Sequence, residues 1–519
     1  MKEYNYLKLK GFELIKIEKL NESAYKIISE TQLYLDEIKQ LCSAKIPNAQ
    51  FLPAVRMGYS DGVKYFYKDC GDYLIVPKGF IKGIIKRLNE KYKLELSFDD
   101  EIEKITEEEF NKFVKSLKLP FEPYDFQLKA AFDSINTGNN ICVMATGSGK
   151  SLTIYILCRW FIEKYKNTDD KILIIVPSVV LLNQMYSDFK EYGFTDIDKY
   201  VDRLGGDFKV VSFVKKLNIS TWQSLYRNVS LFKDITVIIE DECHTAASDV
   251  HESIIFPSAT NAKYRFGFTG TLPQNYCDKL SLMAVLGTAK TYVTPRELID
   301  MGLATEMEIK PIILKYNDAT SSIVRTVKNY QQEVSFFLGI PERDDIIAKL
   351  ICKVSQKGNS IVLFTRVSNG ENLARKVCKL KHGVDVEISE LRKLNKYNIF
   401  FVSGETKASD REAIRQIMES CDDAIIFGTT SIMSTGVNIR KLKNLVSTMP
   451  GKSYIKINQS IGRMLRKHET KNNIVYLYDI VDDARGRYAK KNYMFKHYEE
   501  RLKYYNENQY VIDEVIVNI

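Results

Sequence analysis

Residues 144–151 read Met-Ala-Thr-Gly-Ser-Gly-Lys-Ser, and they lie between an apolar run that ends at Val143 and a helix-like run that begins at Leu152. This order predicts a strand, a glycine-containing turn and a helix. The two glycines allow the backbone N–H groups to converge at the positive end of the helix, where a polyphosphate fits. The fold expected around such a turn is an α/β fold with a parallel sheet.

The same loop suggests a division of chemical roles. Lys150 can reach the outer phosphates, and Ser151 can reach a magnesium ion. The usual pattern G-x-x-x-x-G-K-[ST] is not fully met, because Met144 takes the place of its first glycine. An ordinary glycine turn before a helix is the alternative for the loop alone. The residues expected to hold the nucleotide here are Thr146, Gly147, Ser148, Gly149, Lys150 and Ser151.

Composition sets broad limits on the protein class. A length of 519 residues exceeds what one hydrophobic core normally serves. The net charge of +9 permits a polyanionic partner without requiring one. Nine scattered cysteines without a C-x-x-C pair indicate reduced thiols rather than a zinc site. Because no signal-peptide pattern and no run of eighteen apolar residues is visible, we expect a cytoplasmic protein that does not engage membranes.

The hydrophobic pattern predicts four regions. Residues 1–110 mix alternating and helical runs, which favours a small α+β domain. Residues 111–285 alternate apolar strands with amphipathic stretches, and residues 286–480 repeat this rhythm, so we expect two tandem parallel-sheet domains. Residues 481–519 interleave basic and aromatic side chains. That last segment is typical of a nucleic-acid surface, and it equally fits a helix with its tyrosines packed inward and its lysines outward; the two interpretations are compatible.

A second chemical element follows the apolar run 237–239 and reads Glu-Asp-Glu-Cys-His. Asp241 suits an outer role on Mg²⁺, and Glu242 could orient and deprotonate the water that attacks the terminal phosphate. We expect His244 to form a hydrogen bond across the domain cleft. An acidic strand end by itself is commonly a turn or a helix cap. The phosphate-type loop, about ninety residues upstream, favours the catalytic interpretation.

Together, Ala-Thr-Gly-Ser-Gly-Lys-Ser and Asp-Glu-Cys-His resemble the superfamily 2 helicases. The resemblance implies two RecA-like domains that clamp ATP and Mg²⁺, preceded here by the small α+β domain. Tyr124 and Gln127 match the family's adenine-recognising element. Strand-end segments resemble those that hold the nucleic-acid backbone through hydroxyl and main-chain groups. The residues expected to contact DNA are Pro177, Ser178, Thr221, Gln223, Ser403, Thr429 and Thr435.

The second predicted domain carries further residues of the same resemblance. Gly436 and Asn438 lie in a segment that touches the nucleotide in the family, although aspartate is more usual at the position of Asn438. Helical spacing places Gln459, Arg463 and Arg466 along one face, and the resemblance implies catalytic roles for them. An arginine brought against the γ-phosphate by domain closure accelerates hydrolysis by about 10³ to 10⁵. A solvated arginine helix is the alternative.

Over the whole chain, the sequence resembles the phage UvsW-type helicases, and the likeness includes segments 51–56, 59–62 and 74–80 of the first region. This implies an ATP-dependent DNA helicase or translocase that unwinds and reanneals forks and junctions in replication, recombination or repair, with residues 1–110 as a DNA-binding domain that grips duplex. Its location would be the host cytoplasm if it is phage-encoded. An RNA helicase and the motor subunit of a restriction system stay open as alternatives. Retention of Lys150, Glu242 and Arg466 argues against a module that only binds ATP.

Overall fold

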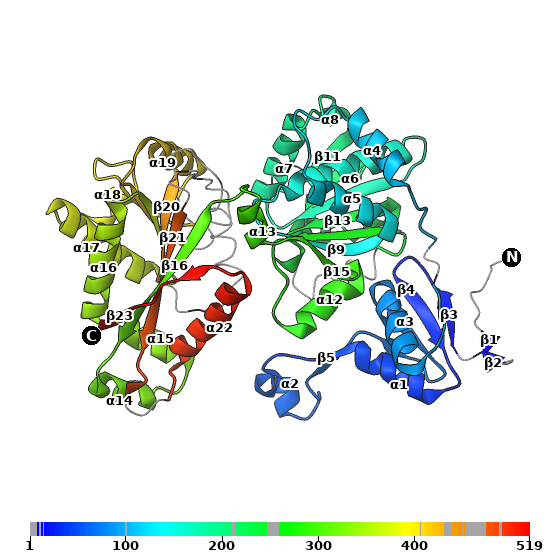
Figure 1. The fold of residues 1–519 in the computed structure, drawn as a ribbon, viewed down its shortest axis with the longest axis horizontal. Coiled ribbons are helices and arrows are strands. Elements are labelled where there is room, and N and C mark those ends of the chain that lie inside the picture. The colour runs from blue at the N-terminus through cyan, green and yellow to red at the C-terminus, as the bar shows by residue number, and fades with distance from the viewer. Residues whose placement is uncertain are drawn as a thin grey trace. The chain divides into compact units, whose positions relative to one another are not determined.

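The structure is a computed structural model. It describes all residues except 1–7, 10, 11, 14, 99, 100, 207, 209–212, 246–258, 405, 430–438, 440, 449, 450, 452–473 and 487–489. The described chain forms two compact units, Met1–Met144 with Ser148–Val293 and Thr294–Ile519, and the short loop segment Ala145–Gly147 groups with the second (Figure 1). Within this described part, no helix has both the length and the apolar character needed to cross a bilayer.

The first unit begins with a small α+β region built on an antiparallel sheet. The strand order is β3-β4-β8-β7, with bounds β3 (Lys16–Lys19), β4 (Ala24–Ile28), β7 (Lys68–Asp69) and β8 (Tyr73–Pro77). Helices α1 (Gln32–Leu41) and α3 (Lys78–Tyr92) pack on it. Apolar residues of α3 recur at helical spacing, so Ile81, Ile84 and Leu88 form one buried face. The predicted α+β region is therefore present.

Seven parallel strands form the larger sheet of the first unit. Their order is β11-β12-β10-β13-β14-β9-β15. The bounds are β9 (Asn139–Met144), β10 (Lys171–Val176), β11 (Val201–Leu204), β12 (Leu217–Thr221), β13 (Ile235–Asp241), β14 (Tyr264–Thr269) and β15 (Ala289–Val293). The helices between strands include α5 (Asp125–Thr137), α6 (Lys150–Lys164), α7 (Val179–Glu191), α9 (Trp222–Tyr226) and α12 (Tyr276–Leu286). Hydrophobic runs that are buried on both faces explain the parallel arrangement.

The amino-terminal region and this sheet domain share one hydrophobic core. Cys277, Leu280 and Ala284 of α12 belong to the same buried cluster as the inner face of α3. Buried polar bonds reinforce the junction. Arg265 Nη2 donates to Ser23 Oγ at 2.5 Å, and Lys78 Nζ donates to the carbonyl of Lys263 at 3.0 Å. The two regions therefore form one folded body, although the hydrophobic pattern suggests separate domains.

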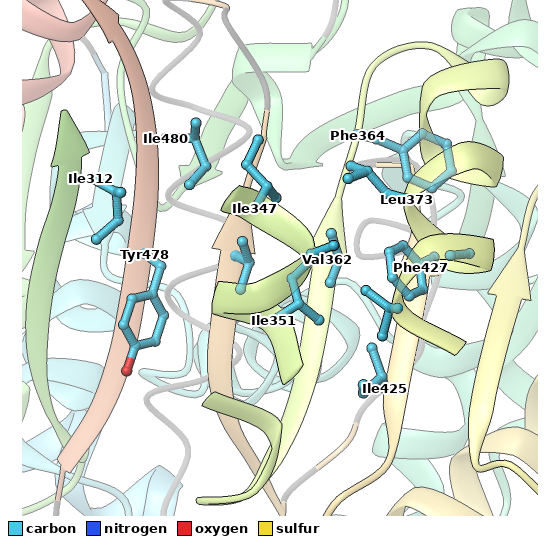
Figure 2. Packing of buried hydrophobic residues seen from close by; sticks show 14 of the residues in the cluster. Ile312, Ile347, Ile351, Val362, Phe364, Leu373, Ile425, Phe427, Tyr478 and Ile480 are labelled. Atoms are coloured by element: carbon cyan, nitrogen blue, oxygen red, sulfur yellow. The ribbon is translucent and has the colours of Figure 1, made fainter. Parts of the chain in front are cut away.

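The second unit holds an eight-stranded parallel sheet. The path is β18-β19-β17-β20-β21-β16-β22, and β23 also pairs with β16. The bounds are β16 (Glu306–Lys315), β17 (Asn359–Leu363), β18 (Ile399–Val402), β19 (Ile425–Gly428), β20 (Leu442–Ser447), β21 (Ile474–Asp483), β22 (Val511–Ile512) and β23 (Val515–Asn518). Ile347 and Ile351 of α16 (Pro341–Ser355) pack against the sheet near Val362 (Figure 2). The predicted second α/β domain is present.

The carboxyl-terminal segment completes this second sheet. Helix α22 (Tyr493–Glu507) buries Tyr498, Tyr504 and Tyr505 and leaves Lys496 and Lys503 exposed. The inward-packed helix is thus the arrangement found. Because β21 runs through the predicted boundary at residue 480, and β15 follows the predicted boundary at 285, we propose domain limits at 293/294 and a second domain of residues 294–519.

The shared core leads to a test at Gly79. A Cβ atom placed there would lie 1.8 Å from the carbonyl oxygen of Met283 on α12, which is impossible without moving one helix. We expect Gly79→Ala to lower the free energy of unfolding by about 3 kcal/mol. The measurement is denaturant unfolding of the full chain. Gly83→Ala on the same helix is the control, since nothing lies within 4 Å there, and it should be neutral or stabilising by up to about 1 kcal/mol. Equal effects of both substitutions would contradict the shared core.

Candidate nucleotide site

The loop after β9 adopts the geometry that its glycines suggest. Gly147 has a φ of 87° and Gly149 a φ of 76°, both in the left-handed region that glycine enters without strain. Position 149 also lacks room for a side chain, because a Cβ atom there would lie 2.4 Å from Gln127 Nε2. Helix α6 begins at the next residue, Lys150. The loop and the positive end of α6 therefore form the arrangement that binds phosphate groups.

Gln127 holds this loop in place from helix α5. Its Nε2 donates to the carbonyls of Ser148 and Gly149 at 2.7 and 3.4 Å, and its Oε1 accepts from the backbone N–H of Tyr124 at 2.9 Å. The amide is buried and bonded at both ends. The predicted adenine-reading role would require these bonds to change. The ring of Tyr124, in contrast, is largely exposed and lies stacked on Phe126.

The structure brings together the lysine and glutamate that we expected to be catalytic. Lys150 Nζ lies 3.8 Å from Glu242 Oε1 and 3.4 Å from the Met144 carbonyl oxygen. Both side chains are mostly buried. The Lys150 amine therefore lies between Met144, at the end of β9, and Glu242, which follows β13. An outer phosphate bound in the loop would lie between the lysine and the glutamate.

The end of β13 places its two carboxylates in different environments. Glu242 has a φ of 49°, a left-handed conformation that is uncommon for a side-chain-bearing residue and frequent at functional sites. Its backbone N–H donates to Asp241 Oδ1 at 3.0 Å. Burial, followed by the nearby charge of Glu242, raises the pKa of Asp241 to about 7. A divalent cation beside such a pair would compensate its negative charge.

The donor atoms at this position fit magnesium. Ser151 supplies a hydroxyl oxygen and Asp241 a carboxylate oxygen, and oxygen ligands combined with substrate phosphates are the usual environment of Mg²⁺. Ser151 has a neighbour that sequence reasoning missed. Its Oγ lies 2.7 Å from the hydroxyl of Tyr192, which follows α7. No motif signals this tyrosine, because it lies 41 residues away in the chain.

His244 interacts within its own domain. Its Nδ1 lies 2.7 Å from Thr269 Oγ1 at the end of β14, and 3.4 Å from Glu242 Oε2. This bond connects two neighbouring strand ends, and the bond that we expected across the domain cleft stays a prediction. Burial lowers the pKa of His244. Thr269 Oγ1 in turn donates to the carbonyl of Thr271, so the hydroxyl motif and the acidic motif form one polar network.

Two segments that we expected to contact nucleic acid lie side by side in the first unit. β10 and β12 are parallel neighbours, with Val176 opposite Thr221. Gln223 Nε2 reaches the carbonyl of Pro177 at 3.5 Å. The hydroxyl of Ser178 accepts from Leu181 N–H and caps α7. Thr221 is buried and bonds Ser224, whereas Gln223 is exposed. Of these side chains, Gln223 is the most available to a ligand.

The second unit shows the same arrangement at its own strand ends. Ser403 follows β18 and Thr429 follows β19, and these strands are parallel neighbours with Val402 opposite Gly428. The backbone N–H of Ser403 donates to Thr406 Oγ1 at 3.0 Å. The remaining predicted positions lie outside the described residues; they are Thr435, Gly436, Asn438, Gln459, Arg463 and Arg466.

Two protein-family models match this chain, one in each of its large sheet domains. Residues 84–274 match the family described as type III restriction enzyme, res subunit, and residues 342–468 match the helicase conserved C-terminal domain. The chain belongs to the superfamily 2 helicases. Members of this superfamily hydrolyse ATP, so the chain is an ATP-hydrolysing enzyme with two RecA-like domains.

This helicase is similar to individual proteins along most of its length. It is 28% identical to the ATP-dependent DNA helicase uvsW of Enterobacteria phage T4, over 91% of this chain and 94% of that one. The crystal structure of T4 UvsW covers 97% of this chain and 99% of its own, with 26% identity and a TM-score of 0.49. The helicase is also 21% identical to the type I restriction enzyme EcoAI endonuclease subunit of Escherichia coli, over 67% of this chain and 44% of that one.

The loop anchor leads to a test at Gln127. Gln127→Ala removes the bonds to two loop carbonyls, and at about 0.5–1.5 kcal/mol each their loss should weaken ATP and GTP binding alike by about tenfold. Equilibrium binding of both nucleotides measures this. Lys129→Ala, at an exposed position on the same helix, is the control and should bind as the wild type does. A loss confined to ATP would instead support the adenine-reading role and contradict the anchor.

Proposed function

We propose that this helicase is an ATP- and Mg²⁺-dependent DNA helicase or translocase that unwinds and reanneals forks and junctions. The observation that carries the proposal is the convergence of Lys150, Glu242 and the glycine loop at one sheet edge. Similarity to a phage DNA helicase over nine-tenths of both chains supports the choice of DNA. The similarity to the restriction subunit covers less than half of that subunit, which makes the restriction motor the weaker alternative.

The described residues divide the hydrolysis chemistry among themselves. Lys150 neutralises outer phosphate charge, and the loop N–H groups orient the phosphate chain. Ser151 and Asp241 would hold Mg²⁺, which supplies charge neutralisation between phosphates. Glu242 lies where it can orient a water molecule and accept its proton. From the sequence we assign the arginine contribution to Arg466, with Gln459 and Arg463 beside it on the same predicted helix face.

The amino-terminal region carries a surface suited to DNA bases. We call residues 43–65 the tip; they include η1 (Ala49–Phe51), α2 (Pro53–Arg56) and the flanking strands β5 (Ser43–Lys45) and β6 (Val63–Tyr65). Figure 1 shows α2 extending away from α1 and α3. Apolar side chains of the tip are exposed to solvent: Tyr59 is 83% exposed, Met57 68% and Phe51 63%. Exposed apolar groups concentrated in this way mark an interaction site.

Backbone hydrogen bonds give the tip a defined main-chain conformation, which fixes the points from which its exposed side chains emerge. Ile46 N–H donates to Gly62 O, and Tyr59 N–H donates to Ala54 O, both at 2.8 Å. Lys45 and Arg56 are exposed, and the Arg56 guanidinium lies over the Phe51 ring at 6.0 Å from its centroid. Rings that stack on bases, with cations beside them for phosphates, are the combination that single-stranded and branched DNA requires. We therefore infer that the tip contacts DNA where a duplex opens.

The first test of the proposal concerns hydrolysis. Glu242→Gln should still bind ATP but lose about 10²–10⁴ in turnover, because the general base is removed. Turnover is measured with and without forked DNA, and with RNA of the same sequence. Glu163→Gln, exposed on α6, is the matched control and should retain activity. Normal turnover of Glu242→Gln would refute its role, and equal stimulation by RNA would favour an RNA helicase.

The second test concerns the tip. Combined Phe51→Ala and Tyr59→Ala should weaken binding to a fork by about tenfold or more, since stacking contributes about 1–3 kcal/mol per base. ATPase without DNA should stay unchanged, because the tip is outside the nucleotide site. Leu20→Ala, another exposed apolar residue between β3 and β4, is the control. Fork affinity equal to that of the wild type would remove the tip from DNA recognition.

A further inference from the structure

Helix α7 delivers a hydroxyl to the serine that follows the loop lysine. Tyr192 caps the carboxyl end of α7, and its backbone N–H donates to the carbonyl of Asp188 at 2.9 Å. Its phenol oxygen lies 2.7 Å from Ser151 Oγ. A phenol hydroxyl can either donate or accept a hydrogen bond. The serine therefore has a fixed partner on a different helix.

Aromatic packing fixes where this hydroxyl lies. The Tyr192 ring makes edge contacts with Tyr155, at 5.5 Å between ring centroids, and with Phe121, at 5.7 Å. Tyr155 is fully buried and lies one turn after Ser151 on α6. The ring alone satisfies this packing, since edge contacts between aromatic groups do not involve the hydroxyl. The hydroxyl is thus an additional feature, directed at Ser151.

The carboxyl end of α7 neighbours Ser151, one of the two residues that we assign to magnesium. Tyr192 is not part of the motifs that define the site in the sequence.

The chemistry of a serine ligand explains what the tyrosine can do. A hydroxyl that binds Mg²⁺ uses an oxygen lone pair, and the cation makes its remaining O–H a stronger donor. An acceptor placed at hydrogen-bonding distance then orients the lone pair toward the metal. Partners of this kind around a metal site typically change metal affinity or activity by about 10- to 100-fold when they are removed. Tyr192 Oη is such an acceptor.

We propose that Tyr192 is a positioning residue that accepts a hydrogen bond from Ser151 and orients the serine oxygen toward the Mg²⁺ of the bound nucleotide. This inference rests on the proposed function of Ser151 as a magnesium ligand. It adds a group from outside the loop to the metal site. It also links the site to Phe121, three residues before Tyr124.

The test is nucleotide binding, measured without turnover. Tyr192→Phe keeps the ring and removes the hydroxyl, so the affinity for ATP in Mg²⁺ should fall by about tenfold while the affinity in EDTA is unchanged. Tyr155→Phe is the matched control. It removes a hydroxyl from the same aromatic cluster, but that hydroxyl bonds Arg159 rather than the loop. Its affinity should equal that of the wild type under both conditions.

A double substitution separates the role of Ser151 as a metal ligand from the role of Tyr192 in positioning it. Once Ser151→Ala has removed the ligand, adding Tyr192→Phe should cause no further loss. A normal magnesium response of Tyr192→Phe, or tighter binding in Mg²⁺, would overturn the inference alone. Equal losses in Mg²⁺ and EDTA would show a merely structural hydroxyl and overturn it as well. A normal magnesium response of Ser151→Ala would overturn the proposed function of the serine, and the inference with it.

Discussion

The parallel register of three adjacent strands determines the site. Ile141 on β9 lies opposite Gly267 on β14, which lies opposite Glu240 on β13. Because parallel strands end at the same edge, the residues that follow them meet there, although they are distant in the chain. The loop lysine, the acidic pair and the hydroxyl motif at Thr269 are each the continuation of one of these strands. A shift of this register would separate lysine from glutamate.

A second consequence of the fold is that the amino-terminal region and the candidate nucleotide site share one folded body. The strand that ends at Thr269 continues into α12, and α12 packs against α3 of the amino-terminal region. Arg265, within the same strand, bonds Ser23 in that region. The proposed DNA-contacting tip is therefore built on the same core as the nucleotide site. This arrangement favours a coordinated response of both surfaces over independent movement of a tethered domain.

Local patterns in the sequence were sufficient for the main elements. Apolar runs followed by glycine or acidic residues predict buried strands that end at a polar edge, and the structure has both parallel sheets. The carboxyl-terminal segment was ambiguous, because inward tyrosines and outward lysines produce the same pattern as a nucleic-acid surface. Burial of Tyr498 and Tyr505 shows that the inward-packed helix is present. The domain limit at Val293 also needed strand pairing, since β15 contains exposed as well as buried residues.

By itself, the sequence predicted which residues would carry phosphate chemistry and determined that they follow buried strands, because the glycines, Lys150 and the acidic pair stand directly after apolar runs in the chain. Only the tertiary structure decided the partners of single side chains. Gln127 faces the loop, His244 faces Thr269 and Tyr192 faces Ser151. The physical reason is that such contacts depend on how helices and strands pack, and packing brings together residues that no short sequence pattern relates.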